Sequence, residues 1–227
     1  ALDPSPWQHG HGDAAMVDEG KGDDARLTSD VLLSSLRRAL RATSLAPELQ
    51  REELLRTRLA APISRVRVAP SPIHGSGVFA TRAIDKGEII TLFPGDALIY
   101  YPLTDTGVKD TRDGLIFGCH VPKELQDAQL VMREYRRYSY DVDGYYAIVG
   151  LPCLIQDPAY LGHMCNDGAT MTSAEHREEY LRESALRNNA VFQNVLDAQV
   201  ALVARVSIGA AEEVLAAYGP EYWTSML

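Results

Sequence analysis

The stretch DPAYLGHMCNDG, residues 157–168, decides how the rest of this chain of 227 residues is interpreted. It combines a short apolar run with His163, Cys165, Asn166 and Asp167, and on its own it indicates little. It gains meaning from two other segments, HGSGVFA at residues 74–80 and EEVLAAYGPEYW at residues 212–223. The interpretation of the chain depends on these three segments and on their order.

The segment HGSGVFA lies in a part of the chain where strand patterns repeat. Residues 65–68 alternate in polarity, residues 78–80 form a short apolar run, and residues 88–93 are typical of a strand. No long helix follows Gly75 and Gly77, as a dinucleotide-binding unit would require, so these glycines do not indicate a phosphate cradle. Two interpretations remain: a plain hairpin turn, and a turn that lets the backbone approach a ligand closely.

In this order, the three segments resemble the signature motifs of SET-domain protein lysine methyltransferases. That family has a GxG followed by an apolar pair, then an Asn-His-Ser-Cys core, and finally a Glu-Glu/Leu strand that ends in Tyr-Gly. The resemblance covers roughly residues 63–227. It implies a mainly β fold with helical insertions, in which short sheets surround a threaded, pseudoknot-like core.

The resemblance also implies a site. It makes Tyr218 the catalytic residue and S-adenosylmethionine the cofactor, with no metal ion. The implied cofactor-binding residues are Ser76, Gly77, Gly162, His163 and Trp223. Gly162 and Met164 stand where the family has asparagine and serine, which we expect to weaken cofactor binding without abolishing it. Either Tyr138 or Tyr140 is expected to line a substrate channel.

The cysteines give no independent sign of a metal site or a disulfide framework. Cys119, Cys153 and Cys165 are odd in number, widely spaced and without a CxxC pair. His163 and Cys165 together raise the alternative of a thiol nucleophile, which we discount because no third group is identified to orient the base. His9 and His11 are interpreted as part of a solvated terminal tract.

The order of composition along the chain predicts three regions. Residues 1–25 are rich in Gly, Asp and Pro and are expected to be a disordered tail. Residues 26–62 predict a helical hairpin with one helix starting near Val31 and the other near Pro47. Its leucines should be buried against the following domain, or else against a partner protein. Residues 63–227 form the SET domain, with inserts near 101–140 and 169–187.

The charge and hydropathy limit the classes of partner. With 22 basic and 31 acidic residues, the formal net charge is −9, which argues against direct nucleic-acid binding through phosphates. The acidic surface favours a basic protein or peptide, with a histone tail as one possibility; simple solubility explains the charge equally well. No membrane-spanning run and no secretion signal are recognised, so an intracellular location, nuclear or cytoplasmic, is expected.

Two functions follow from these expectations. The first is transfer of a methyl group from S-adenosylmethionine to a lysine amine of a protein. The alternative is a catalytically weak or inactive SET-like module that binds protein partners, an idea favoured by Gly162 and Met164. Tyr218 and the HGSGVF segment favour the enzyme.

Overall fold

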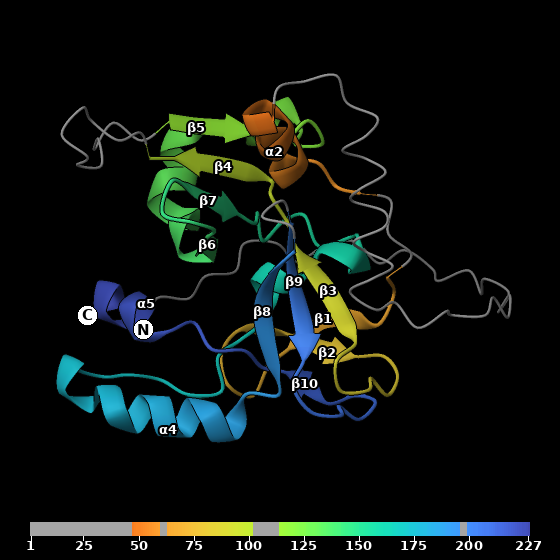
Figure 1. Cartoon of the computed structure of the whole chain (residues 1–227), viewed down its shortest axis with the longest axis vertical. Coiled ribbons are helices and arrows are strands. Elements are labelled where there is room, and N and C mark those ends of the chain that lie inside the picture. The colour runs from red at the N-terminus through yellow and green to blue at the C-terminus, as the bar shows by residue number, and fades with distance from the viewer. Residues whose placement is uncertain (1–46, 60–62, 102–113, 196–198) are drawn as a thin grey trace, which may run out of the picture.

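The computed structural model describes residues 47–59, 63–101, 114–195 and 199–227 (Figure 1). The expected tail over residues 1–25 and the first helix of the expected hairpin lie outside the described residues. The described part is built from three small antiparallel sheets and a few short helices, which confirms the mainly β fold. None of its helices combines the length and the apolar composition needed to cross a membrane.

Two of the sheets have three strands each. The first has the order β1-β2-β10 and the second β3-β9-β8. Their strands are β1 (Val66–Pro70), β2 (Ser76–Ala80) and β10 (Glu213–Val214), and β3 (Ile89–Phe93), β9 (Gln199–Ala204) and β8 (Ala190–Val195). Every residue of β3, at one edge of its sheet, and of β9, at the centre, is buried.

The third sheet has the order β5-β4-β7-β6. Its strands are β4 (Ala97–Tyr100), β5 (Gly114–Phe117), β6 (Ser139–Asp141) and β7 (Tyr146–Val149). The pair β6–β7 and its turn were expected from the sequence. The strands β4 and β5 were not, because residues 94–118 contain many turn-forming residues and only short apolar runs.

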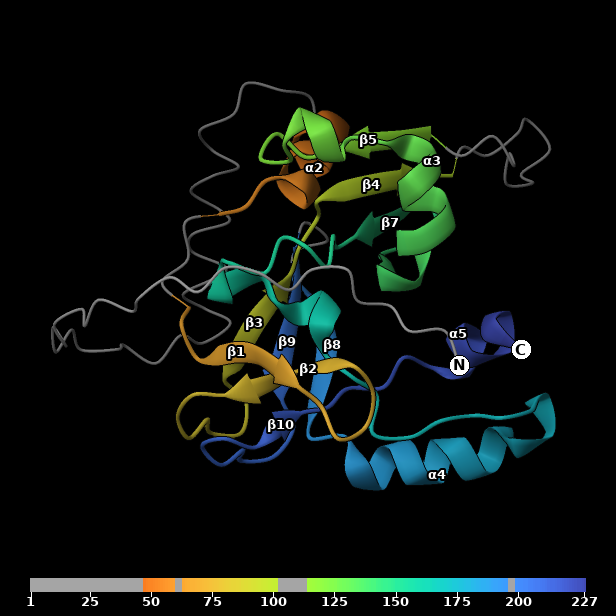
Figure 2. The ribbon, with the colours of Figure 1, turned by 180° about the vertical axis from the view of Figure 1, so that it is seen from behind.

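The helices lie at the edges of the sheets. They are α2 (Pro47–Arg56), α3 (Ala128–Leu130), α4 (Arg177–Arg187) and α5 (Pro220–Met226). The composition of residues 121–138 predicts a single helix, but the structure has short turns there instead. Helix α3 continues into a π-helical turn (Val131–Tyr135) and then a 3₁₀ turn (Arg136–Tyr138). In both views α5 lies between α4 and the third sheet (Figures 1 and 2).

The chain end after β10 runs between two earlier segments. The amide of Ala216 donates to the carbonyl of Asn166 at 2.9 Å, and the amide of Ala190 donates to the carbonyl of Leu215 at 2.9 Å. The bridges between Asn166 and Leu215 and between Ala190 and Ala216 are both parallel. Residues 214–218 are thereby held between the stretch 157–168 and the start of β8, and this is the threaded core that the fold class implies.

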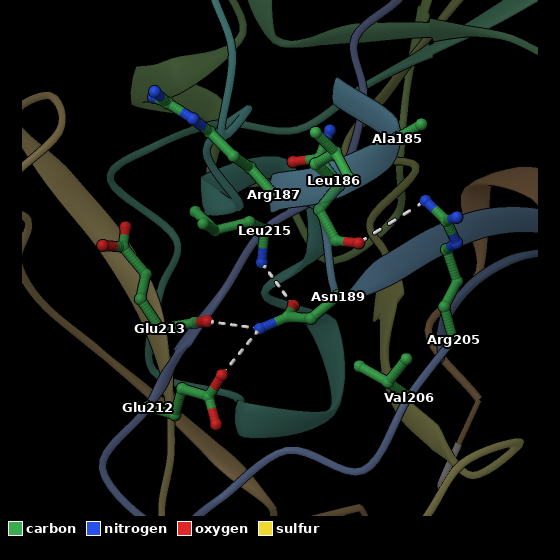
Figure 3. A pocket seen from close by; sticks show the side chains of 10 residues that line it. Ala185, Leu186, Arg187, Asn189, Arg205, Val206, Glu212, Glu213 and Leu215 are labelled. Atoms are coloured by element: carbon green, nitrogen blue, oxygen red, sulfur yellow. Dashed lines mark hydrogen bonds between the residues drawn. The ribbon is translucent and has the colours of Figure 1, made fainter. Parts of the chain in front are cut away.

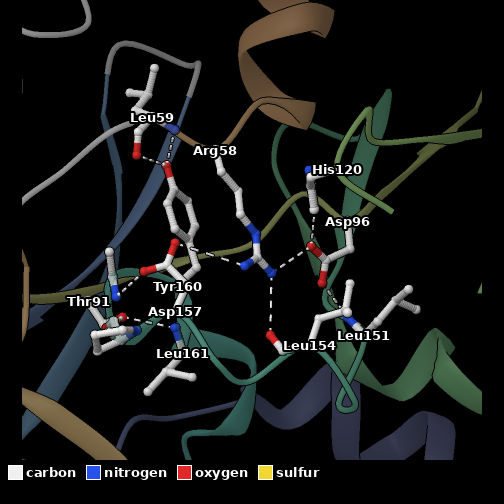
Figure 4. Close-up of polar contacts among 12 residues, drawn as sticks. Arg58, Leu59, Thr91, Asp96, His120, Leu151, Leu154, Asp157, Tyr160 and Leu161 are labelled. Carbon is white, nitrogen blue, oxygen red and sulfur yellow. Dashed lines mark hydrogen bonds and ion pairs between the residues drawn. The ribbon is translucent and has the colours of Figure 1, made fainter. Parts of the chain in front are cut away.

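Helix α2 is part of the folded domain. Its residues Leu54 and Leu55 are buried, and Leu55 packs with Phe93 and Leu98. Just beyond the helix, Arg58 donates to the fully buried carboxylate of Asp96 at 3.0 Å, which also bonds His120 (Figure 4). A helix is present where the sequence predicts one near Pro47, and Leu54 and Leu55 are buried, whereas the hairpin as a unit stays a prediction. Leu33, Leu36 and Leu40 lie outside the described residues.

Gly95 is required for this docking, and we expect Gly95→Ala to destabilise the protein by about 1–3 kcal/mol, as overpacking does. A Cβ atom on Gly95 would overlap the carbonyl oxygen of Leu55 in α2, so the helix would have to move. Thermal unfolding followed by circular dichroism measures the loss. Gly114→Ala is the control, because its Cβ would meet Tyr100 at an ordinary 3.8 Å. Equal stability of the two variants would contradict the prediction.

Candidate functional site

Tyr218 lies directly after the threaded strand and is fixed at both ends. Its hydroxyl donates to the carbonyl of Cys165 at 2.9 Å, and its backbone amide donates to Oδ2 of Asp167 at 2.9 Å. Burial, with smaller contributions from Cys165, Tyr222 and Asp167, raises the pKa of Tyr218 well above its usual range. The hydroxyl is therefore protonated across the physiological range and acts as a hydrogen-bond donor.

The carboxylate of Asp167 holds the surroundings of Tyr218 together. It is 3% exposed and accepts five hydrogen bonds. Three donors meet Oδ2: the Tyr218 amide, the Tyr180 hydroxyl at 2.6 Å and the Trp223 indole N–H at 3.3 Å. Two meet Oδ1: the Asn188 side-chain amide and the Ala169 amide, each at 3.0 Å. Burial and the bond to Asp167 raise the pKa of Tyr180 to about 12. One carboxylate thus joins α4, α5 and the end of the threaded strand.

A second set of contacts joins the HGSGVFA turn to the same stretch. The side-chain amide of Asn166 donates to the carbonyls of His74 at 3.1 Å and Ser76 at 3.2 Å, and to Oε1 of Glu213 at 3.0 Å. A Cβ atom on Gly77 would overlap the Glu213 carboxylate, which would have to move away from Asn166. Carbonyl and carboxylate oxygens therefore gather around the side chain of Asn166. The preceding residue, Cys165, accepts the Tyr218 hydroxyl at its backbone carbonyl.

Aromatic rings surround the Tyr218 hydroxyl. The ring of Tyr218 lies stacked with Trp223 at 5.9 Å and edge-on to Tyr222 at 4.7 Å. Tyr138 interacts electrostatically with both Tyr218 and Tyr222. Tyr140 instead packs in the core, with its ring 5.9 Å from that of Phe93. Of the two tyrosines that the sequence left open, Tyr138 is the one near Tyr218, and its place in a substrate channel stays a prediction.

A cavity of about 430 Å³ lies beside the threaded strand and not at Tyr218 (Figure 3). It is lined by the end of α4, by Arg205 and Val206, and by Glu212, Glu213 and Leu215. Within it the Asn189 amide donates to the carbonyl of Glu213 at 2.8 Å and accepts from the Leu215 amide at 2.8 Å. The polar groups of Asn189 therefore hold the threaded strand and are not open to a ligand.

A comparison with models of protein families matches the SET domain over residues 75–219. The chain belongs to the SET-domain family. SET-domain proteins are generally S-adenosylmethionine-dependent lysine methyltransferases. A search of curated proteins found no match. Among solved structures, a Plasmodium falciparum "putative histone methyltransferase" is similar at 17% identity and a TM-score of 0.33, over 69% of this chain and 94% of that one. A likeness at this level carries no argument about function.

The SET-domain residues predicted to bind the cofactor fall into two groups. Ser76 and Gly77 lie beside Asn166 and Glu213, and Trp223 lies beside Tyr218, as described above. Gly162 and His163 are placed apart, in a short turn (Gly162–Met164) that packs against β3; a Cβ on Gly162 would lie 3.0 Å from the carbonyl oxygen of Leu92. A role for Gly162 and His163 in cofactor binding stays a prediction that would have to act through their backbone.

The ring of His163 is enclosed by apolar groups. It is 5% exposed and lies edge-on to Phe93 at 6.3 Å and to Tyr138 at 6.5 Å. Neither ring nitrogen makes a hydrogen bond with any of the described residues. Burial lowers the pKa of His163 to about 4, and the nearby Asp96 carboxylate opposes this only in part. The fold therefore holds the neutral imidazole, which packs as an apolar wedge between β3 and Tyr138.

This burial predicts a pH dependence of stability that His163→Leu should remove. Unfolding frees the ring to bind a proton below its ordinary pKa of 6.5, whereas the folded ring resists until about 4. The contribution of neutral His163 to the free energy of unfolding is fully present above pH 6.5. It falls by about 1.4 kcal/mol per pH unit as the pH drops from 6.5 to about 4. Urea unfolding at pH 7, 6 and 5 measures the slope. Wild type and His163→Leu are compared because carboxylates titrate in both; parallel slopes would contradict the prediction.

The chemistry of a thiol nucleophile has no support at this site. Cys165 is buried, its thiol donates to the carbonyl of Val214 at 3.1 Å, and burial raises its pKa well above the usual range. Its partner in that alternative, His163, makes no bond to it. Within residues 47–59, 63–101, 114–195 and 199–227, no three His, Cys, Asp or Glu side chains gather as metal ligands would.

The sequence interpretation gave Asn166 and Asp167 a substitute role, in which they take over some of the hydrogen bonds of the replaced family asparagine and serine. It assigned them as extra polar residues beside His163 and Cys165, yet they make most of the polar contacts of the site. The signal that could have found them is the family's Arg-Phe-Ile-Asn-His-Ser motif aligned four residues later. In that register Asn166 takes the place of the asparagine, Asp167 that of the histidine, and His163 that of the arginine.

Proposed function

We propose that this SET domain is a protein lysine methyltransferase that uses S-adenosylmethionine as the methyl donor. The observation that carries the proposal is that two neighbouring residues, Cys165 and Asn166, bind the Tyr218 hydroxyl and the oxygen acceptors of the Gly77 turn, respectively. Cys165 accepts the Tyr218 hydroxyl at 2.9 Å, while Asn166 bonds the Gly77 turn and Glu213. A hydroxyl and a set of oxygen acceptors are thus fixed next to each other at the end of a threaded strand.

The residues present fit the donor molecule. S-adenosylmethionine carries positive charge on its sulfonium and amino groups, and the acceptors at the turn are the carbonyls of His74 and Ser76 and the Glu213 carboxylate. Gly77 lets the backbone approach such a group closely. Trp223 and Tyr222 offer aromatic surface beside Tyr218 for the adenine. When bound, the donor supplies an electrophilic methyl group.

The protein's own residues then prepare the lysine amine. An amine with a pKa near about 10.4 must lose a proton before it can attack. The half-buried rings of Tyr138, Tyr218 and Tyr222 disfavour its charged form and lower that pKa. The Tyr218 hydroxyl, held by Cys165 and protonated, aligns the amine and stabilises the polarised methyl group. This arrangement requires no metal ion and no covalent intermediate.

The second candidate function is a SET-like module that binds proteins without turnover. The observation that favours it is the placement of Gly162 and His163. A Cβ on Gly162 would meet β3, and the ring of His163 is buried, so neither residue offers an accessible polar group to a cofactor. Asn166 and Asp167 offset this loss because they provide polar groups at the neighbouring positions. We therefore favour the enzyme.

The test is methyl transfer from radiolabelled S-adenosylmethionine to histones and to a cell lysate, together with calorimetric binding of the donor. We expect labelled protein and measurable donor binding, and we expect Gly77→Val to weaken both because its side chain would displace the Glu213 carboxylate. Donor binding without labelling of any protein would favour the binding module. Absence of donor binding in the wild type would overturn the proposed function.

The substrate class and the cellular compartment are also proposals. The family acts on proteins, and a basic substrate such as a histone tail was expected from the net charge of −9. A nuclear or cytoplasmic location agrees with that expectation. The net charge of the whole chain does not describe the charge beside Tyr218, however, and that local charge leads to a different substrate.

A further inference from the structure

Basic residues gather on the segment that leads to Tyr138. Between Val131 and Tyr138 the chain carries Arg133, Arg136 and Arg137, with Glu134 as the single acidic residue. All four are exposed. Since Tyr138 faces Tyr218 and Tyr222, this segment borders the place where a lysine side chain would enter. The border is positive in a chain whose net charge is −9.

Arg137 is the closest of these arginines to the tyrosines. Its guanidinium lies over the ring of Tyr138 at 5.4 Å, and its charge acts on the hydroxyl of Tyr222. It forms no salt bridge with any carboxylate of the described residues. Tyr138 therefore holds the guanidinium at the rim, with its hydrogen-bond donors free to meet a partner from solution.

The exposed carboxylates near this rim already have cationic partners, and the buried carboxylate of Asp167 is satisfied by five hydrogen-bond donors. Glu134 pairs with Arg133 at 2.7 Å, and Glu221 at the start of α5 pairs with Arg177 at 3.1 Å. Arg136 stacks on Tyr101, with 6.0 Å between guanidinium and ring. The charges of Glu134 and Glu221 are thus balanced by Arg133 and Arg177, whereas the exposed guanidinium of Arg137 pairs with no carboxylate of the described residues. A substrate side chain placed next to the lysine would meet this charge first.

We propose that the preferred substrate is a lysine flanked in its own chain by acidic residues, with a flanking carboxylate paired to Arg137. A guanidinium offers two parallel N–H donors to a carboxylate, which gives both direction and selectivity. A basic flank would bring like charges together at the rim. This inference rests on the proposed function for the position of the lysine, and it deepens that function by naming the class of substrate.

The range of each charge decides between this inference and the expectation of a basic tail. At physiological ionic strength, exposed charges are screened beyond about 8 Å. The acidic surface elsewhere on the chain therefore influences the approach of a substrate, whereas the residue beside the bound lysine responds to Arg137. The preference for a particular flank should for this reason come from the rim and not from the net charge.

The experiment uses the whole chain and three peptides that are identical except at the positions on either side of a single lysine, which are Glu, Ala or Arg. For each, kcat/KM is measured with labelled S-adenosylmethionine, and peptide binding is measured by fluorescence anisotropy without the donor. In both assays we expect the order Glu, Ala, Arg, with about five-fold or more between the first and the last. Arg137→Glu should reverse the order, and Arg137→Ala should flatten it.

Arg182→Glu is the matched control, because Arg182 is exposed on α4 and its replacement changes the net charge by the same amount. It should keep the wild-type order. A wild-type preference for the Arg-flanked peptide, an order that Arg137→Glu leaves unchanged, or no binding of any peptide would each overturn the inference. Binding in the expected order without methyl transfer would support the inference and count against the proposed function.

Discussion

Tyr218→Phe is expected to lower kcat for methyl transfer by about 100-fold or more, the order seen when one preorganised hydrogen-bonding group is removed from an active site. The hydroxyl is the only part of the side chain that changes, and the ring contacts with Trp223 and Tyr222 stay. The hydroxyl is held by the carbonyl of Cys165 in the free protein, so it is already in position when substrate arrives.

The same substitution should leave the fold and donor binding nearly intact. It removes the hydrogen bond from the Tyr218 hydroxyl to the carbonyl of Cys165, which is worth about 1 kcal/mol. The backbone amide of Tyr218 still donates to Asp167. Single-turnover kinetics, calorimetric donor binding and thermal unfolding separate these effects. Tyr222→Phe is the matched control and should cost less than about ten-fold; full activity in Tyr218→Phe would refute the catalytic assignment.

The sequence predicted the fold well because its motifs coincide with local structure. The turn at residues 74–77, the strands β1, β2 and β3, and the short last strand before Tyr218 all occur near the expected positions. Each has an apolar run or alternation bounded by turn residues, which is the strongest signal in a single sequence. Helix α2 was predicted for the same reason, with Pro47 in its first turn.

The sequence failed where tertiary contacts override local preference. Residues 128–138 have helical composition, yet α3 gives way there to a π-helical turn and then to a 3₁₀ turn. The segment has to place Tyr138 near Tyr218 and to start β6 at Ser139. Strands β4 and β5 were missed because each has four residues and pairs through contacts distant in sequence.

The site was predicted in part for a related reason. Tyr218, Ser76, Gly77 and Trp223 are identified by motifs, and the structure brings Tyr218 and Trp223 together on one side and the turn to Asn166 on the other. The role of Asp167 has no local signal. Its donors come from residues 169, 180, 188, 218 and 223, and only the threaded fold places them around one carboxylate.

The carboxylate of Asp167 should be the most sensitive polar group in the domain, and we expect Asp167→Ala to cost at least about 3 kcal/mol of stability. Alanine would leave five donors without their acceptor in a site that is 3% exposed. A buried donor without a partner costs about 1–3 kcal/mol. Part of this is recovered if α5 opens to water, in which case the Trp223 ring leaves its place beside Tyr218.

Asp167→Asn distinguishes the need for two acceptor oxygens from the need for the side chain itself. An amide keeps one oxygen, and its NH₂ group must face one of the two sets of donors. The Tyr180 hydroxyl could rotate to accept from it, but the Tyr218 amide and the Trp223 indole N–H could not. We therefore expect Asn to fall between the wild type and Ala in stability, and to lower kcat for methyl transfer because Tyr218 loses its backbone anchor.

Tryptophan fluorescence reports the local change directly, since Trp7 and Trp223 are the two tryptophans of the chain. In a Trp7→Phe background, Asp167→Asn and Asp167→Ala should shift the Trp223 emission to longer wavelength at temperatures where circular dichroism shows the fold intact. Tyr180→Phe is the control: it removes one donor to Asp167 and the acceptor for the Gly219 amide, but four donors still reach the carboxylate. Its emission should stay near that of the wild type. If Asp167→Asn matched Tyr180→Phe in emission, stability and kcat, Asp167 would be one buried polar residue among several, and the position of Tyr218 would have to be explained by the threaded strand alone.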